Sequence, residues 1–265
     1  MTVRQEKSPF IQACRREPVP YTPVWYMRQA GRSLPEYRAL RERWKLVEIV
    51  AQPELCAEVT LQPVRRHGVD AAVMFADIML PLIGIGVELE LVEAIGPVIA
   101  RPVRDEEGVN ALRPLEPEED VDFVLASIRA TLARLDGEVP LIGFSGAPFT
   151  LASYLIEGRP SRDFVHTKRF MYSRPDLWER LMQRLADLVT SYARAQVAAG
   201  IHAFQLFDSW VGTLSLDDYV RYVRPYTRPI FEALEEAGVP SITFGTGTAG
   251  LLESMRNTGG DAVGV

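Results

Sequence analysis

The sequence is poor in cysteine and in long apolar stretches. Only two cysteines, Cys14 and Cys56, occur among its 265 residues, which excludes a disulfide-rich scaffold and a zinc ribbon. The longest apolar run, residues 78–87, contains Pro81 and two glycines and is too short to span a bilayer. The first six residues are polar and lack the apolar core of a signal peptide. We therefore expect a cytoplasmic protein without membrane association.

Positive charge is also in deficit, because 29 lysines and arginines face 35 acidic residues and give a net charge of −6. This balance argues against a general nucleic-acid or membrane-surface binder. Residues 1–66 differ from the rest, with ten arginines and two lysines against seven glutamates, so the other 199 residues carry a net −11. The basic segment indicates either a solvated helical surface or a site for an anion, and both interpretations are open.

Short apolar runs alternate with helical patterns along the chain. The predicted strands are residues 24–27, 71–75, 141–144, 203–207, 241–244 and 262–265, with 87–91 as a hairpin arm or excursion. The predicted helices are residues 53–67, 117–135, 147–157, 162–172, 177–199, 216–237 and 250–255, and the one at 216–237 is expected to be interrupted near Pro225 and Pro229. Ser8 and Pro9 predict the start of a further helix, and Gly68 and Gly200 predict two helix ends.

Strands that alternate with long helices predict a parallel α/β fold. We interpret residues 1–265 as a single domain, a (β/α)8 TIM-type barrel truncated at its C-terminus, with about six of eight βα units present. An open doubly wound sheet is the alternative.

Functional side chains of parallel α/β proteins gather just beyond the carboxyl ends of the strands. At these positions the sequence places Arg28 and Arg32 after the first predicted strand and the isolated carboxylate of Asp77 after the second. Two guanidinium groups facing one carboxylate indicate a pocket for an anionic substrate, since the arginine fork binds carboxylates with two hydrogen bonds. The alternative is a set of surface ion pairs, for example between Arg32 and Glu36.

Four segments carry a resemblance to a known family. They are PVWYMRQAGR at 23–32, GFSGAPFTLASYLIEG at 143–158, FDSW at 207–210 and FGTGTAGLL at 244–252. In this order they resemble the uroporphyrinogen decarboxylase family. The resemblance implies a (β/α)8 barrel, a homodimer, no metal or organic cofactor, and a cyclic tetrapyrrole substrate with eight carboxylates.

The resemblance also implies roles for individual residues. It implies a catalytic role for Asp77, and it places Arg28 and Arg32 on the substrate carboxylates, with one of them a candidate proton relay. The implied substrate-binding residues are Arg28, Gln29, Ala30, Gly31, Arg32, Arg41, Asp77, Tyr154 and Ser209. The family's C-terminal histidine has no counterpart here, and we expect His67, His166 and His202 to be structural or surface residues.

The implied reaction converts four acetate side chains of uroporphyrinogen III to methyl groups, giving coproporphyrinogen III in haem or chlorophyll biosynthesis. A pyrrole that is protonated on a ring carbon can accept the electrons that leaving CO₂ releases, so no external electron sink is needed. A preorganised carboxylate, Asp77, would stabilise this cation in a site of low dielectric constant.

Three alternatives remain at this stage. Residues 245–250 fit the glycine pattern G-x-G-x-x-G of dinucleotide-binding proteins, or a tight barrel turn. A related corrinoid-dependent methyltransferase would carry a zinc site, but Ile242 is not followed by a His-x-Cys element. A non-catalytic tetrapyrrole-binding protein would bind the same ligand without releasing CO₂.

Overall fold

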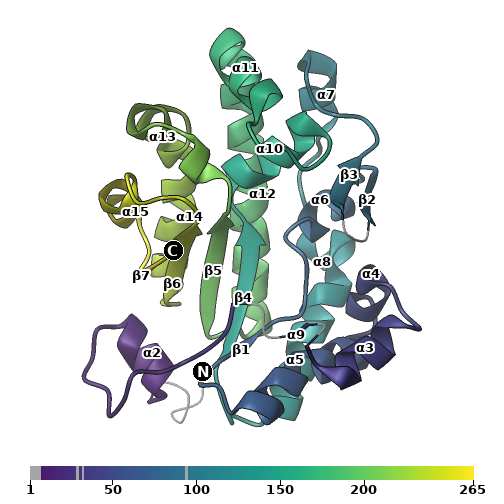
Figure 1. Ribbon diagram of the computed structural model, residues 1–265, viewed down its shortest axis with the longest axis vertical. Helices are drawn as coiled ribbons and strands as arrows, with labels where there is room; N and C mark the ends of the chain where they lie inside the picture. Colours follow the sequence, from purple (N-terminus) through teal and green to yellow (C-terminus); the bar gives the residue numbers. More distant parts are fainter. Residues whose placement is uncertain (1–6, 28–29, 32, 93–94) are drawn as a thin grey trace.

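The computed structural model describes residues 7–27, 30–31, 33–92 and 95–265. Within these ranges, five parallel strands form one sheet in the order β1-β4-β5-β6-β7 (Figure 1). The strands are β1 (Ala72–Val73), β4 (Leu141–Gly146), β5 (Ala203–Asp208), β6 (Ser241–Gly245) and β7 (Ala262–Gly264). Each neighbouring pair is parallel, as the alternation of strands and helices predicted.

A separate hairpin leaves this series between β1 and β4. It consists of β2 (Leu89–Val92) and β3 (Gly96–Ile99), which pair antiparallel. The hairpin confirms the excursion predicted around residues 87–91.

Helices connect the strands. They are α2 (Pro9–Cys14), α3 (Pro35–Arg41), α4 (Leu46–Val50), α5 (Pro53–His67), α6 (Leu80–Gly84), α7 (Glu106–Ala111), α8 (Pro117–Asp120), α9 (Asp122–Leu135), α10 (Pro148–Glu157), α11 (Val165–Ser173), α12 (Pro175–Ala199), α13 (Leu216–Tyr222), α14 (Arg224–Glu236) and α15 (Leu252–Thr258). The Ser8 hydroxyl accepts the Ile11 N–H and caps α2. Gly68 and Gly200 end α5 and α12 in the left-handed conformation. These ends confirm the capping predictions, because glycine adopts a positive φ without steric cost.

Successive side chains of each strand point to opposite faces of the sheet. Phe204 and Leu206 of β5 pack in the main core, together with the apolar side of α12. Figure 1 shows α12 behind the sheet. On the other face, Ala203 packs with Ile142 and Ile242 and with residues of α2. The two faces therefore have separate cores, and α2 covers the second near the amino ends of the strands.

Some predicted boundaries are wrong. Residues 24–27 do not form a strand, although the Asp70 N–H donates to the Val24 carbonyl at 2.8 Å. The predicted helix at 117–135 is divided at Val121. The helix predicted at 216–237 is divided at Val223, which confirms the interruption expected near Pro225, whereas Pro229 lies inside α14. Local apolar composition does not distinguish an extended segment from a strand, because the difference lies in its hydrogen-bond partners.

The sheet is open between β1 and β7 in the described part of the chain. The described residues thus supply five of the six predicted strands. None of the helices that the structure describes combines the length and apolar character needed to cross a membrane.

Candidate active site

A pocket of about 580 Å³ lies at the carboxyl ends of the strands. The side chains that line it are mostly apolar or aromatic, and the polar ones are few. Its lining residues are Met27, Ala30, Tyr37, Leu46, Val73, Met74, Phe75, Ala76, Asp77, Ile78, Pro97, Phe144, Tyr154, Phe207, Ser209, Trp210, Phe244 and Thr246. A concave, mainly apolar pocket with a few polar groups is typical of small-molecule sites.

Three aromatic rings from neighbouring strands form one wall of this pocket. Phe144 of β4 and Phe244 of β6 each contact Phe207 of β5 edge to face, with centroid distances of 5.3 and 5.4 Å. The sheet places them together, because Phe207 is paired in register with Phe244 and its side chain points to the face opposite Leu206. The resulting wall is apolar and suits a planar or ring-shaped ligand.

Asp77 lies on the loop between β1 and α6. Its Oδ1 accepts the Met79 N–H at 2.8 Å. Asp77 lines the pocket and is half-buried. Burial therefore raises the pKa of Asp77 above its usual range, and the Met79 hydrogen bond opposes the increase.

Tyr154 and Ser209 reach the same pocket from two different elements. Tyr154 lies on α10, and its ring contacts that of Trp210 edge to face at a centroid distance of 5.9 Å. Ser209 follows β5 directly, and its backbone carbonyl accepts the Thr246 hydroxyl from the loop after β6. Asp77, Tyr154 and Ser209 are separated by up to 132 positions in sequence, and the structure brings them to one pocket.

Of the remaining predicted residues, some line the pocket and others do not. Ala30 lines the pocket, whereas the Gly31 carbonyl accepts the Leu34 N–H. Arg41 is outside the pocket lining, and its Nη1 donates to the Trp44 carbonyl at 2.9 Å. The predicted residues Arg28, Gln29 and Arg32 lie outside the described residues.

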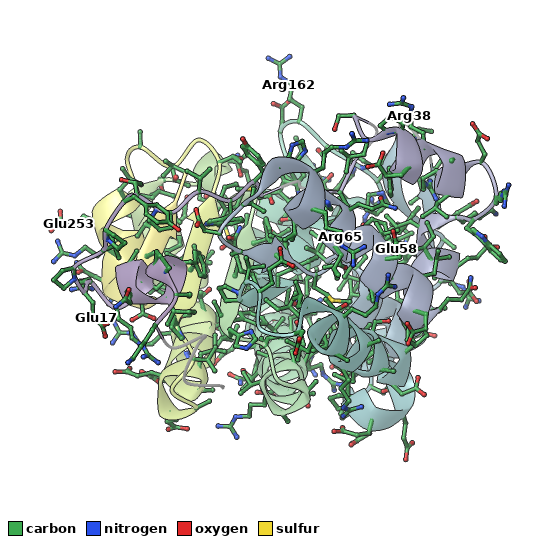
Figure 2. All side chains as sticks on the ribbon, turned by 90° about the horizontal axis from the view of Figure 1, so that it is seen from below. Glu17, Arg38, Glu58, Arg65, Arg162 and Glu253 are labelled. Atoms are coloured by element: carbon green, nitrogen blue, oxygen red, sulfur yellow. The ribbon has the colours of Figure 1, made fainter. Side chains whose placement is uncertain are left out.

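Several arginines of the basic segment lie at the surface. Arg66 donates two hydrogen bonds to Glu36, at 3.2 and 2.9 Å. Glu36 therefore pairs with Arg66, whereas the sequence spacing suggested Arg32 as its partner. Figure 2 shows Arg65 beside Glu58, with a closest N–O distance of 3.9 Å. The solvated-surface interpretation therefore holds for these two arginines.

Sequence reasoning missed several polar or aromatic side chains of the pocket, among them Tyr37, Trp210 and Thr246. Trp210 and Thr246 follow β5 and β6, so their position after predicted strands was an available signal. Tyr37 lies on α3 and contacts Phe75 at a centroid distance of 5.7 Å. No strand-end rule would have identified it.

His67 and His166 are exposed, whereas His202 and the glycine-rich turn after β6 make contacts within the fold. His202 is buried, and its Nδ1 accepts the Leu141 N–H at 2.9 Å. The segment after β6 approaches the loop after β5 so closely that a Cβ on Gly212 would lie 2.1 Å from the Thr246 carbonyl oxygen. The described residues contain no group of three or more His, Cys, Asp or Glu side chains able to hold a metal ion.

A parallel α/β sheet with this pocket at its strand ends is typical of barrel-type α/β enzymes. The sequence matches the family described as uroporphyrinogen decarboxylase (URO-D) over residues 5–265. The chain belongs to the uroporphyrinogen decarboxylase family, whose members are carboxy-lyases of porphyrin biosynthesis.

Two relatives show the extent of the similarity. The chain is 59% identical over 255 residues to a uroporphyrinogen decarboxylase of Thermus thermophilus, a match that covers 96% of this chain and 74% of that protein. It is 54% identical over 264 residues to one of Thermobifida fusca, covering 100% of this chain and 73% of that protein.

A solved structure shares the fold. A methyltransferase from Methanosarcina mazei superposes with a TM-score of 0.81 and 19% sequence identity, covering 98% of this chain and 75% of that one. The likeness confirms the predicted barrel-type α/β fold class.

Proposed function

We propose that this chain decarboxylates the four acetate side chains of uroporphyrinogen III to methyl groups, yielding coproporphyrinogen III. Family membership supports the reaction. The observation that carries the proposal within the site is the Asp77 carboxylate, which lies in a pocket whose walls are mainly apolar or aromatic. A carboxylate with few protein partners can accept hydrogen bonds from the pyrrole N–H groups of a macrocycle.

The geometry suits the charge changes of this reaction. Protonation of a pyrrole ring carbon creates a cation, the C–C bond to the carboxylate breaks, and the electron pair flows into the ring as CO₂ leaves. Protonation of the exocyclic carbon and loss of the ring proton then give the methyl group. Asp77 stabilises the cation throughout, because charge interactions are stronger where water is excluded.

The other residues bind rather than react in this proposal. Tyr154 of α10 and Ser209 of the loop after β5 offer hydroxyl groups to the macrocycle, and the ring of Phe207 offers it an apolar surface. We assign Arg28 and Arg32 to the carboxylate arms, with Gln29, Ala30 and Gly31 contributing from the same segment of the sequence. Since arginine stays charged near neutral pH, it suits this binding task.

Replacement of Asp77 tests the proposal. Asp77→Asn removes the charge but keeps the shape, so kcat should fall about 100- to 1000-fold, the loss typical of one preorganised electrostatic group. KM should change far less, because the arms still anchor the substrate. The assay follows coproporphyrinogen formation by chromatography after oxidation to the porphyrins.

A matched control keeps the test specific. Asp187→Asn changes an exposed carboxylate of α12 that accepts the Gln183 amide at 2.9 Å, and it should leave kcat unchanged. Equal turnover of Asp77→Asn and the unmodified protein would remove Asp77 from the chemistry.

The proposal also includes a cytoplasmic homodimer. The resemblance implies the dimer, and the free thiols of Cys14 and Cys56 suit a reducing compartment. Light scattering coupled to size-exclusion chromatography tests the dimer, which requires a mass of twice 29.7 kDa.

A further inference from the structure

A second carboxylate lies behind the pocket wall. Asp208 is the last residue of β5 and is 4% exposed. It follows Phe207, whose side chain lines the pocket, and strand alternation turns Asp208 toward α10 on the other face. It is outside the pocket lining, so it does not meet a ligand there.

The partner of Asp208 is a fully buried threonine. The Thr150 hydroxyl donates to Oδ1 of Asp208 at 2.9 Å, and the same hydroxyl oxygen accepts the backbone N–H of Trp210 at 3.4 Å. Thr150 lies in the first turn of α10. One hydroxyl thus joins the end of β5, the loop after it and the start of a helix.

The joined elements carry pocket residues. The loop after β5 presents Ser209 and Trp210, and α10 presents Tyr154 one turn beyond Thr150. The ring contact between Tyr154 and Trp210 connects them again at the pocket surface. A displacement of the loop relative to the helix would therefore move Ser209 and Trp210 relative to Tyr154 and change the shape of the pocket.

We propose that Asp208 and Thr150 are positioning residues of the substrate pocket, which hold the Ser209–Trp210 loop on α10. Burial of a carboxylate has a desolvation cost that an apolar residue at this position would avoid. The presence of Asp208 therefore indicates that its hydrogen bond to Thr150 has a role. Burial raises the pKa of Asp208 to about 7, and the Thr150 hydroxyl and N–H oppose the increase. Tyr219 of α13 is also close enough to be affected by the Asp208 charge.

Two substitutions at Thr150 separate positioning from stability. Thr150→Val keeps the shape and removes the hydroxyl, whereas Thr150→Ser keeps the hydroxyl. Because the inference rests on the proposed decarboxylation, KM for uroporphyrinogen III is measured in both variants and in Asp208→Asn. We expect KM to rise about tenfold in Thr150→Val, with a smaller change in kcat, and to be restored in Thr150→Ser.

A second readout does not depend on activity. The chain has four tryptophans, so fluorotryptophan labelling gives four ¹⁹F NMR signals, and Trp210→Phe assigns that of Trp210. Thr150→Val should shift the Trp210 signal while the other three stay in place. A protein that releases no CO₂ would contradict the proposed function, and this readout would still test the positioning.

A control and two contrary outcomes complete the design. Thr227→Val removes another buried hydroxyl, which donates to the Val223 carbonyl at 3.3 Å, and should alter stability without altering KM. An unchanged KM and an unchanged Trp210 signal in Thr150→Val would overturn the inference. So would equal losses in Thr150→Val and Thr150→Ser, because the hydroxyl would then be irrelevant.

Discussion

The substitution Gln196→Met tests whether a side-chain amide replaces a missing strand partner of β4 beside the pocket. The pairing of β1 with β4 ends in register at Val73 and Ile142, so Phe144 lies beyond it. The Gln196 side chain of α12 fills this place, since its Oε1 accepts the Phe144 N–H at 3.1 Å and its Nε2 donates to the Phe144 carbonyl at 2.9 Å. Gly143 makes the contact possible, because a Cβ there would lie 2.5 Å from that Oε1.

The magnitude follows from the two backbone groups. Methionine has a similar length and leaves no large cavity, so lost packing contributes little. A buried backbone donor or acceptor without a partner costs about 1–3 kcal/mol. Because partial relaxation can recover some of the loss at two groups, we expect the free energy of unfolding to fall by about 3 kcal/mol. This corresponds to a decrease in Tm of about 6–12 °C for a chain of this size.

The assay is urea unfolding followed by circular dichroism, with Gln183→Met as the control. Gln183 lies on the same helix but is exposed, and its amide donates to Asp187, so this change should alter the free energy of unfolding by less than about 0.5 kcal/mol. If Gln196→Met changed the free energy of unfolding as little as this control does, the side-chain amide would not substitute for a strand partner.

Two further predictions concern buried titratable groups. Burial lowers the pKa of His202 from 6.5 to about 4, so the unfolded chain binds more protons in that range and the protein should lose stability as pH falls from 6.5 to 4. This loss should shrink in His202→Asn, whose Oδ1 can accept the Leu141 N–H; identical pH dependence in both proteins would refute it. Burial raises the pKa of Cys56 to about 12, so iodoacetamide at pH 8 should label it, by mass spectrometry, only after urea is added. Prompt labelling of the native protein would contradict its burial.

The sequence predicted the elements that obey a periodic or capping rule. The apolar spacing of residues 177–199 predicted α12, and the strand series predicted a parallel sheet. Val24–Met27 has the same apolar composition as a strand, but it is not part of the sheet in the described ranges, where the Asp70 N–H donates to its Val24 carbonyl. The difference depends on contacts about 45 residues away, which a local pattern does not contain.

The site was predictable where strand ends determine it. Asp77 and Ser209 follow strands, and the parallel sheet brings them to one edge. Gln196 was harder to interpret, although a polar residue within the apolar side of α12 was a visible exception. The role of Asp208 could not be predicted from the same rule, because alternation sends its side chain to the helix face rather than to the pocket.

Asp77 and Asp208 show that similar positions after β1 and at the end of β5 serve different purposes. The Asp208 carboxylate is held by a threonine of the scaffold, so its hydrogen-bonding capacity is partly used before any ligand arrives. Within the described ranges, Asp77 accepts the backbone N–H of Met79, and burial disfavours its charge. A ligand that brings N–H donors and then a positive ring lowers that cost, so ionisation of Asp77 and formation of the cation favour each other. In the proposed reaction, the pocket is therefore better matched to the charged intermediate than to the neutral substrate, which is the condition for catalysis.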